Sequence, residues 1–113
     1  MPDGTVHVCA SDGPPVRGER DALDLIAEAW AHDATWVAVP AERLHDDFFS
    51  LRTGAAGEIT QKFVTYRIGL AVVGDISRFT EASAALRAWV LESNRGGHLW
   101  FVRDLAELAA RRP

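Results

Sequence analysis

Four short stretches of the chain have the apolar, often β-branched pattern that is typical of β-strands. In residues 5–10 apolar and polar side chains alternate, which predicts a strand whose apolar face, formed by Val6, Val8 and Ala10, packs on the core. The run 36–40 is almost continuously apolar, as in a strand covered on both faces. The most apolar run, 68–73, is predicted as the central strand, 99–102 as the last strand, and Val16-Arg17 as a short return strand.

Between these stretches, apolar residues recur at the spacing of amphipathic helices. Four helices are predicted: from Asp21 to His32-Asp33, from a start between Ser50 and Thr53 to Tyr66, from Thr80 to Gly96, and from Asp104 to Arg111-Arg112. Asp21, Thr80 and Asp104 are the expected N-caps, and Gly96 is expected to close its helix in the left-handed conformation. Gly54 and Gly57 fall in the second helix, where each costs up to about 1 kcal/mol relative to alanine. We therefore expect close backbone packing, or a bound group, around these two glycines.

Strands that alternate with helices and are joined by short links predict an α/β fold with a mostly parallel sheet. We expect one domain over residues 1–113, with a four- to five-stranded sheet flanked by about four helices. A chain of 113 residues buries roughly 65% of the surface that its unfolded form exposes, which is enough for one core and not for two.

Composition narrows the expected partners and compartments. The chain has 12 Lys+Arg and 16 Asp+Glu, a net charge of −4 of mixed sign along the sequence, so it lacks the basic field that nucleic-acid binding requires. Cys9 is the single cysteine, which excludes an internal disulfide and points to a reducing compartment, expected to be the cytoplasm. Residues 1–4 lack a basic start, and no apolar run approaches the roughly 18 residues that span a bilayer. We expect neither secretion nor a membrane partner.

A series of motifs between residues 40 and 102 resembles one bacterial family. The motifs are Pro40-Ala41-Glu42-Arg43-Leu44, Phe48 to Glu58 (FFSLRTGAAGE), Gln61-Lys62-Phe63, Leu70 to Asp75 (LAVVGD), Glu92 to Gly96 (ESNRG) and Phe101-Val102. Their order and spacing are similar to those of the domain of unknown function 4180. That family has no established activity, so the resemblance implies membership and supplies no chemistry.

The order of elements is also similar to that of STAS domains, the anti-sigma-factor antagonists. In those domains a serine or threonine at the start of the second helix is phosphorylated and so switches partner binding. The resemblance implies Ser50 and Thr53 as the phosphorylation candidates here. The chain departs from the pattern before Gly54, where Arg52-Thr53 stands in place of the characteristic Asp-Ser.

Candidate ligand-binding residues follow the predicted strands. In an open parallel sheet, ligands bind beyond the carboxyl ends of the strands, and helix N-termini point to the same edge. The residues expected there are Glu42, Arg43, Arg52, Thr53, Gly54 and Asp75, which would hold a small anionic ligand. The alternative is that Arg52 pairs with Asp75 or Glu42 and only ties loops together.

Two carboxylates are the candidates for catalysis, Asp75 and Glu58, which would act as a general acid–base pair if they shared one pocket. The alternative for Glu58 is an ordinary ion pair with Lys62 on a solvated helix face. The histidines His7, His32, His45 and His98 lack the spacing of a helical metal pair, and Cys9 is interpreted as an inert core residue, so neither a metal nor a cofactor is expected.

An interface with a protein partner or a second copy is predicted around Trp100, Asn94 and Arg95. For Asn94 and Arg95 the alternative is a role in helix termination. Trp30 and Trp89 lie on helical apolar stripes and are assigned to the core. The interpretation that fits best is a non-enzymatic, STAS-like binding or regulatory module, switched by phosphorylation or a small anionic ligand. The alternative is a small enzyme that uses carboxylate acid–base chemistry on an anionic small molecule.

Overall fold

The sheet has four parallel strands in the order β1-β2-β3-β4. The computed structural model describes residues 5–111 and 113, so the expectations for residues 1–4 and for Arg112 lie outside the described residues. The strands are β1 (Val6–Val8), β2 (Trp36–Pro40), β3 (Gly69–Val73) and β4 (Leu99–Val102). This confirms the parallel sheet, with β2 and β3 at its centre.

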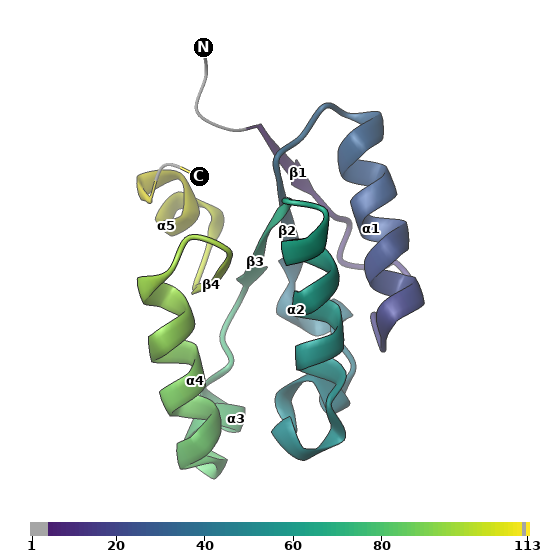
Figure 1. Ribbon diagram of the computed structural model, residues 1–113. Coiled ribbons are helices and arrows are strands. Elements are labelled where there is room, and N and C mark those ends of the chain that lie inside the picture. The colour runs from purple at the N-terminus through teal and green to yellow at the C-terminus, as the bar shows by residue number, and fades with distance from the viewer. Residues whose placement is uncertain (1–4, 112) are drawn as a thin grey trace.

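In the described part of the chain, five α-helices accompany the sheet: α1 (Glu19–Ala31), α2 (Ala55–Thr65), α3 (Ser77–Ala82), α4 (Ala84–Arg95) and α5 (Leu105–Ala110). Figure 1 shows α1, α2 and α4 side by side in one layer over the sheet. This layer follows from the strand order, because right-handed crossovers between successive neighbouring strands place every connecting helix on the same face. No helix within the described residues is long and apolar enough to cross a membrane.

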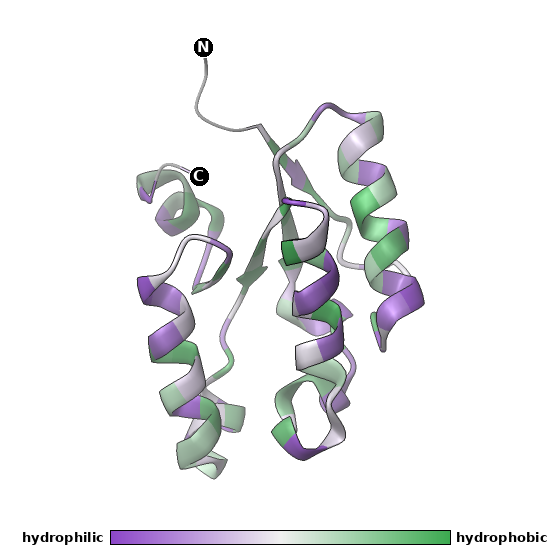
Figure 2. Cartoon of the chain, viewed as in Figure 1, coloured by the Kyte–Doolittle hydropathy of each residue, from purple (hydrophilic) through white to green (hydrophobic). Residues whose placement is uncertain are grey.

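The main core lies between this helix layer and the sheet. It contains the side chains of β2 to β4 that point toward the helices, including Val39, Val72 and Phe101, and the inward residues of α1 and α2, such as Ile26 and Phe63. Figure 2 shows apolar positions gathered in the strands, while green and purple positions alternate along the helices. That alternation is the amphipathic pattern expected from the sequence.

The opposite face of the sheet carries a second, smaller apolar cluster, which α5 covers. It contains Trp36, Ala38, Ala71, Trp100, Val102 and Leu108. The Trp36 and Trp100 rings stack with their centroids 4.2 Å apart. A Cβ at Gly69 would overlap the Trp36 ring, so β3 needs glycine directly beneath it.

The first strand faces the other way from the prediction. Cys9 is 4% exposed and belongs to the main core, whereas Val8 is 51% exposed and Ala10 is exposed. The expectation that this face packs on the core is therefore wrong for Val8 and Ala10, whereas Val6 is partly buried against the smaller cluster on the opposite face of the sheet. Alternation shows which residues share a face, but the helix layer decides which face it covers. Val16 forms a single bridge with Leu44 in place of a return strand.

Three helix ends differ from their predicted positions. Gly18 is the N-cap of α1, and Asp21 lies at N3, where its carboxylate accepts a hydrogen bond from the Arg17 N–H at 2.9 Å. The predicted third helix is divided at Ser83, which caps α4 by accepting from the Leu86 N–H, so Thr80 lies inside α3. Gly96 ends α4 in an extended conformation. The cap at Asp104 is confirmed, since its carboxylate accepts from the Glu107 N–H at 2.8 Å.

Helix α2 begins later than predicted, after 3-10 turns at Ala41–Arg43, Asp46–Phe49 and Leu51–Thr53. Gly54 precedes the helix with φ +79°, a conformation that favours glycine. Gly57 lies in the helix with open space where a Cβ would lie, so the expectation of close packing there is wrong. Lys62 pairs with Glu19 of α1 at 3.0 Å, in place of the predicted pair with Glu58.

The two helical tryptophans have different environments. Trp89 is partly buried and packs against the main core, as predicted. Trp30 is 53% exposed and contacts the Tyr66 ring edge to face, with centroids 5.3 Å apart, so its assignment to the core is wrong. Trp30 lies in the last turn of α1, where the neighbouring Ala29 is the residue that points into the core.

Candidate functional site

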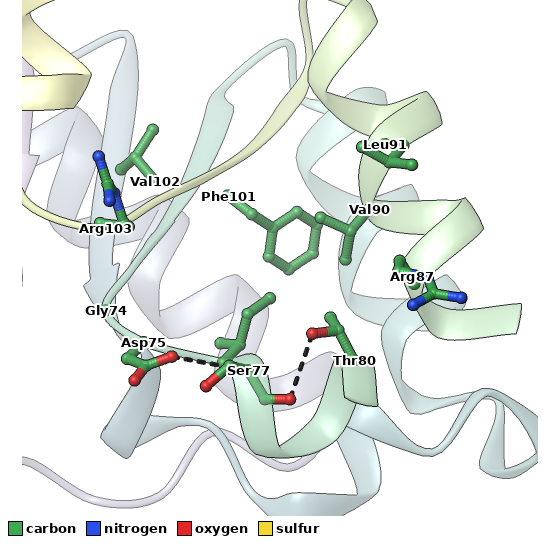
Figure 3. Close-up of a pocket in the computed structure, with 11 residues that line it drawn as sticks. Gly74, Asp75, Ser77, Thr80, Arg87, Val90, Leu91, Phe101, Val102 and Arg103 are labelled. Atoms are coloured by element: carbon green, nitrogen blue, oxygen red, sulfur yellow. Dashed lines mark hydrogen bonds between the residues drawn. The ribbon is translucent and has the colours of Figure 1, made fainter. Parts of the chain in front are cut away.

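A groove of about 290 Å³ lies at the carboxyl ends of β3 and β4 (Figure 3). This is the edge where open parallel sheets bind ligands. The groove is lined by Gly74, Asp75, Ile76, Ser77, Thr80, Arg87, Val90, Leu91, Phe101, Val102 and Arg103. Figure 3 shows Phe101 and Val90 in the middle, with the polar side chains around them. The arrangement is an apolar floor with a polar rim.

The chain leaves β3 through a turn that shapes one wall of this groove. Gly74 has φ +140°, where an L side chain is strained, and its N–H donates to the Val102 carbonyl at 2.9 Å. Asp75 then accepts from the Ser77 N–H at 2.9 Å, and the Thr80 hydroxyl donates to the Ser77 carbonyl at 3.3 Å. These bonds hold the start of α3 against the ends of the strands.

Two arginines lie on opposite sides of the groove, Arg87 from α4 and Arg103 from the end of β4 (Figure 3). Among the described residues, no carboxylate is within ion-pair distance of Arg87. Arg103 pairs with Glu107 at 3.7 Å with its side chain 86% exposed, a geometry in which an ion pair contributes little. Both guanidinium groups are therefore accessible to a ligand anion.

Within residues 5–111, Asp75 is the one acidic side chain on the groove lining. Hydrogen bonds from the Ser77 side chain and backbone lower the pKa of its carboxyl below the ordinary 3.8. The carboxylate is therefore ionised at neutral pH, the opposite of the raised pKa that suits a general acid. Its charge offsets one of the two arginines, which leaves the rim with one net positive charge.

Of the predicted ligand-binding residues, the structure places only Asp75 on this groove. Arg43 is buried and donates to the Pro14 carbonyl at 3.0 Å and the Ala10 carbonyl at 2.9 Å, so it fixes the loop after β1. The others, Glu42, Arg52, Thr53 and Gly54, are exposed residues in or beside the 3-10 turns before α2. Glu58 does not line the groove either, so Asp75 and Glu58 do not share this pocket.

The two phosphorylation candidates lie in the same turns. Thr53 is exposed, and its hydroxyl donates to the backbone carbonyls of Asp47 at 2.7 Å and Ser50 at 2.8 Å. Ser50 is half-buried. Their modification stays a prediction.

The predicted interface residues have contacts inside the fold. The Asn94 amide accepts from the Phe101 N–H at 2.7 Å and donates to the Phe101 carbonyl at 3.3 Å, so it covers the outer edge of β4. Arg95 is exposed beside Glu92, 3.6 Å away. The Trp100 indole N–H donates to the Gly96 carbonyl at 2.7 Å, and the Arg111 guanidinium lies over its ring. An interface here remains a prediction.

Cys9 is buried, as predicted, but it is not isolated. Burial and then the nearby Glu28 carboxylate raise the pKa of its thiol from 9.0 to about 11, against a lowering by Arg43. A thiol with this pKa is protonated at neutral pH and is a poor nucleophile.

Sequence reasoning missed Arg87 and Arg103. Arg103 directly follows a predicted strand, so the rule that ligands bind at the carboxyl ends could have found it. Arg87 lies in the first turn of α4, a helix start that the sequence did not predict because the predicted helix ran on from Thr80 without a break at Ser83. No periodicity in the sequence marks it.

The fold and groove together define a small α/β protein with one parallel four-stranded sheet, helices on both faces and a ligand-sized groove at the strand ends. The family described as "Domain of unknown function (DUF4180)" matches residues 2–111, and the chain belongs to it. No match was found among curated proteins or among solved structures. The resemblance to that family is confirmed, whereas the likeness to STAS domains is not.

Proposed function

We propose that this protein is a non-enzymatic, cytoplasmic binding module whose groove at the ends of β3 and β4 takes a small apolar molecule with one anionic group. The observation that carries the proposal is the placement of Arg87 and Arg103 on either side of a floor formed by Phe101 and Val90. An apolar lining with a few convergent polar groups is the usual composition of a ligand site. A regulatory role would follow from ligand occupancy of this groove.

The size and charge of the groove limit the ligand. A volume of about 290 Å³ lies at the small end of the range for ligand pockets. Two arginines and one aspartate leave one net positive charge, which matches a single carboxylate or another monoanion. Aromatic or branched-chain carboxylic acids fit both limits.

The acid–base alternative has less support. The Asp75 carboxylate accepts a hydrogen bond from Ser77 that stabilises its ionised form, and Glu58 lies outside the groove lining. A phosphorylation switch is a separate proposal that rests on Thr53: a phosphate there would replace its bonds to the Asp47 and Ser50 carbonyls and add negative charge to the turn before α2. Intact-protein mass spectrometry of material from the native host would detect that phosphate.

The direct test is an NMR titration of the ¹⁵N-labelled protein with phenylacetate and with its neutral isostere, phenylacetamide. We expect phenylacetate to shift the amide signals of residues 74–80, 87–91 and 101–103, and phenylacetamide to bind at least several-fold more weakly. Arg87→Gln and Arg103→Gln are expected to reduce this preference for the anion. Arg95→Gln is the matched control, since Arg95 is an exposed arginine on the same helix that does not line the groove. Shifts that lie elsewhere, or an equal preference in all variants, would refute the proposal.

A further inference from the structure

A second group of side chains lies between β1 and α1, on the far side of β2 from the groove. His7 and Cys9 lie two residues apart, so both point to the helix-covered face of the sheet, and Glu28 reaches them from α1. One donor atom from each residue, a ring nitrogen, the sulfur and a carboxylate oxygen, lies within 4.8 Å of the other two. Imidazole, thiolate and carboxylate are the three side-chain ligands of zinc in proteins.

The spacing of these donor atoms fits a single metal ion. Bond lengths of about 2.0–2.3 Å in a tetrahedral site place neighbouring ligand atoms roughly 3.3–3.8 Å apart. The His7 Nε2 and Glu28 Oε1 atoms are 2.9 Å apart in a hydrogen bond, which a bound ion would replace, and the third donor lies no more than 4.8 Å from either. The Glu28 side chain is 47% exposed, so its carboxylate has room to move from His7 to the distance that a shared ion requires.

The surroundings of the three donors include a second histidine and an acidic cavity that Glu28 also lines. The His7 ring stacks on the His32 ring with centroids 4.6 Å apart, and the His32 Nδ1 is 3.0 Å from the Glu28 carbonyl oxygen. Glu28 also lines a small cavity of about 120 Å³ together with Asp21, Asp24 and Arg43. The three carboxylates outnumber the arginine there, so the cavity favours entry of a cation.

We propose that His7, Cys9 and Glu28 bind one divalent ion of the zinc class, which displaces the proton of the Cys9 thiol to solvent as it binds, with the fourth position open to water. Three protein ligands and one open position is the coordination of zinc sites that exchange a ligand. The ion would tie β1, an edge strand of three residues, to α1. The helical spacing rule could not reveal this site, because one of its ligands comes from β1, one from the residue directly after that strand, and the third from the next helix.

Cobalt(II) titration of the tag-free protein, after treatment with a chelator, tests the site directly. Cobalt takes the tetrahedral geometry of zinc, and a cysteine ligand gives it a thiolate-to-metal charge-transfer band. We expect one equivalent of cobalt to produce this band and one equivalent of zinc to abolish it. Cys9→Ser is expected to remove the band, and His7→Gln and Glu28→Gln to weaken cobalt binding at least about tenfold each, because changes even in the residues around a metal's ligands cost that much.

His98→Gln is the matched control, since His98 is an exposed histidine outside the group. It should bind cobalt as the unaltered protein does. A second readout is the melting temperature, which zinc should raise in the unaltered protein and in His98→Gln but not in Glu28→Gln. The Glu28 side chain is about half exposed, at 47%, so its variant decides the question if Cys9→Ser fails to fold. Absence of the charge-transfer band, or binding that survives in both His7→Gln and Glu28→Gln, would overturn the site.

Discussion

Replacing Asn94 with alanine tests how the outer edge of the sheet is protected. β4 is an edge strand, and the Asn94 amide makes the two hydrogen bonds to Phe101 that a further strand would make. Unpaired edges are sites of strand addition and aggregation, so an amide that pairs with the edge has a protective role as well as a stabilising one.

The loss of stability expected in Asn94→Ala follows from these two hydrogen bonds. Each hydrogen bond contributes about 1 kcal/mol net, and the Phe101 N–H and carbonyl are partly buried, so neither is fully hydrated after the substitution. We expect Asn94→Ala to lower the free energy of unfolding by about 2 kcal/mol. The free energy of unfolding of a domain of this size is about 5–15 kcal/mol in total, so a loss of this size would be easily measured.

Urea unfolding, followed by tryptophan fluorescence, gives the free energy of unfolding, and hydrogen exchange gives the local effect. The Phe101 amide hydrogen should exchange faster in Asn94→Ala. The exchange rates of the β2 amides should change only as far as the global stability changes. Glu92→Ala is the control, since Glu92 is an exposed residue of the same helix whose ion pair with Arg95 is weak. A loss below about 0.5 kcal/mol in Asn94→Ala, or an unchanged Phe101 exchange rate, would refute the reasoning.

Three further predictions rest on other contacts. Gly69→Ala is expected to destabilise the protein by about 1–3 kcal/mol in urea unfolding, because the added methyl group overlaps the Trp36 ring; an unchanged midpoint would contradict this. Arg43→Ala is expected to cost about 2–3 kcal/mol and to increase protease cleavage of the loop at residues 10–14, since two hydrogen bonds to that loop are lost; intact resistance to protease would count against it. The pKa of the Asp75 carboxyl is lowered below 3.8 in the folded state. The ionised carboxylate therefore stabilises the fold above pH 3.8, and this contribution is lost as the pH falls through the pKa of the folded state. The carboxyl ¹³C signal of Asp75 should therefore titrate below 3.8, and in Ser77→Ala its midpoint should move up; an ordinary midpoint in the unaltered protein would be inconsistent with the hydrogen bonds.

The two proposed sites are separable by experiment. The groove uses residues of α3, α4 and the ends of β3 and β4, whereas the metal ligands come from β1 and its end and from α1. No residue is shared, so Arg87→Gln should leave cobalt binding unchanged and Glu28→Gln should leave phenylacetate binding unchanged.

Local pattern in the sequence was sufficient for the class of fold. Continuous apolar runs identified β2, β3 and β4, helical periodicity identified α1, α2, α4 and α5, and their alternation implied the parallel sheet. These features depend on each segment burying its own apolar side, which neighbouring residues alone reveal.

Tertiary structure decided the rest. The sequence could not show that the helix layer covers the Cys9 side of β1 and leaves Val8 exposed, because the two faces of a strand differ only in what packs on them. It also could not show that Asn94 pairs with β4, that Arg87 and Arg103 flank one groove, or that His7 and Cys9 meet Glu28. Each of these contacts joins segments that are distant along the chain, and their proximity is fixed only when the crossovers place the helices on the sheet.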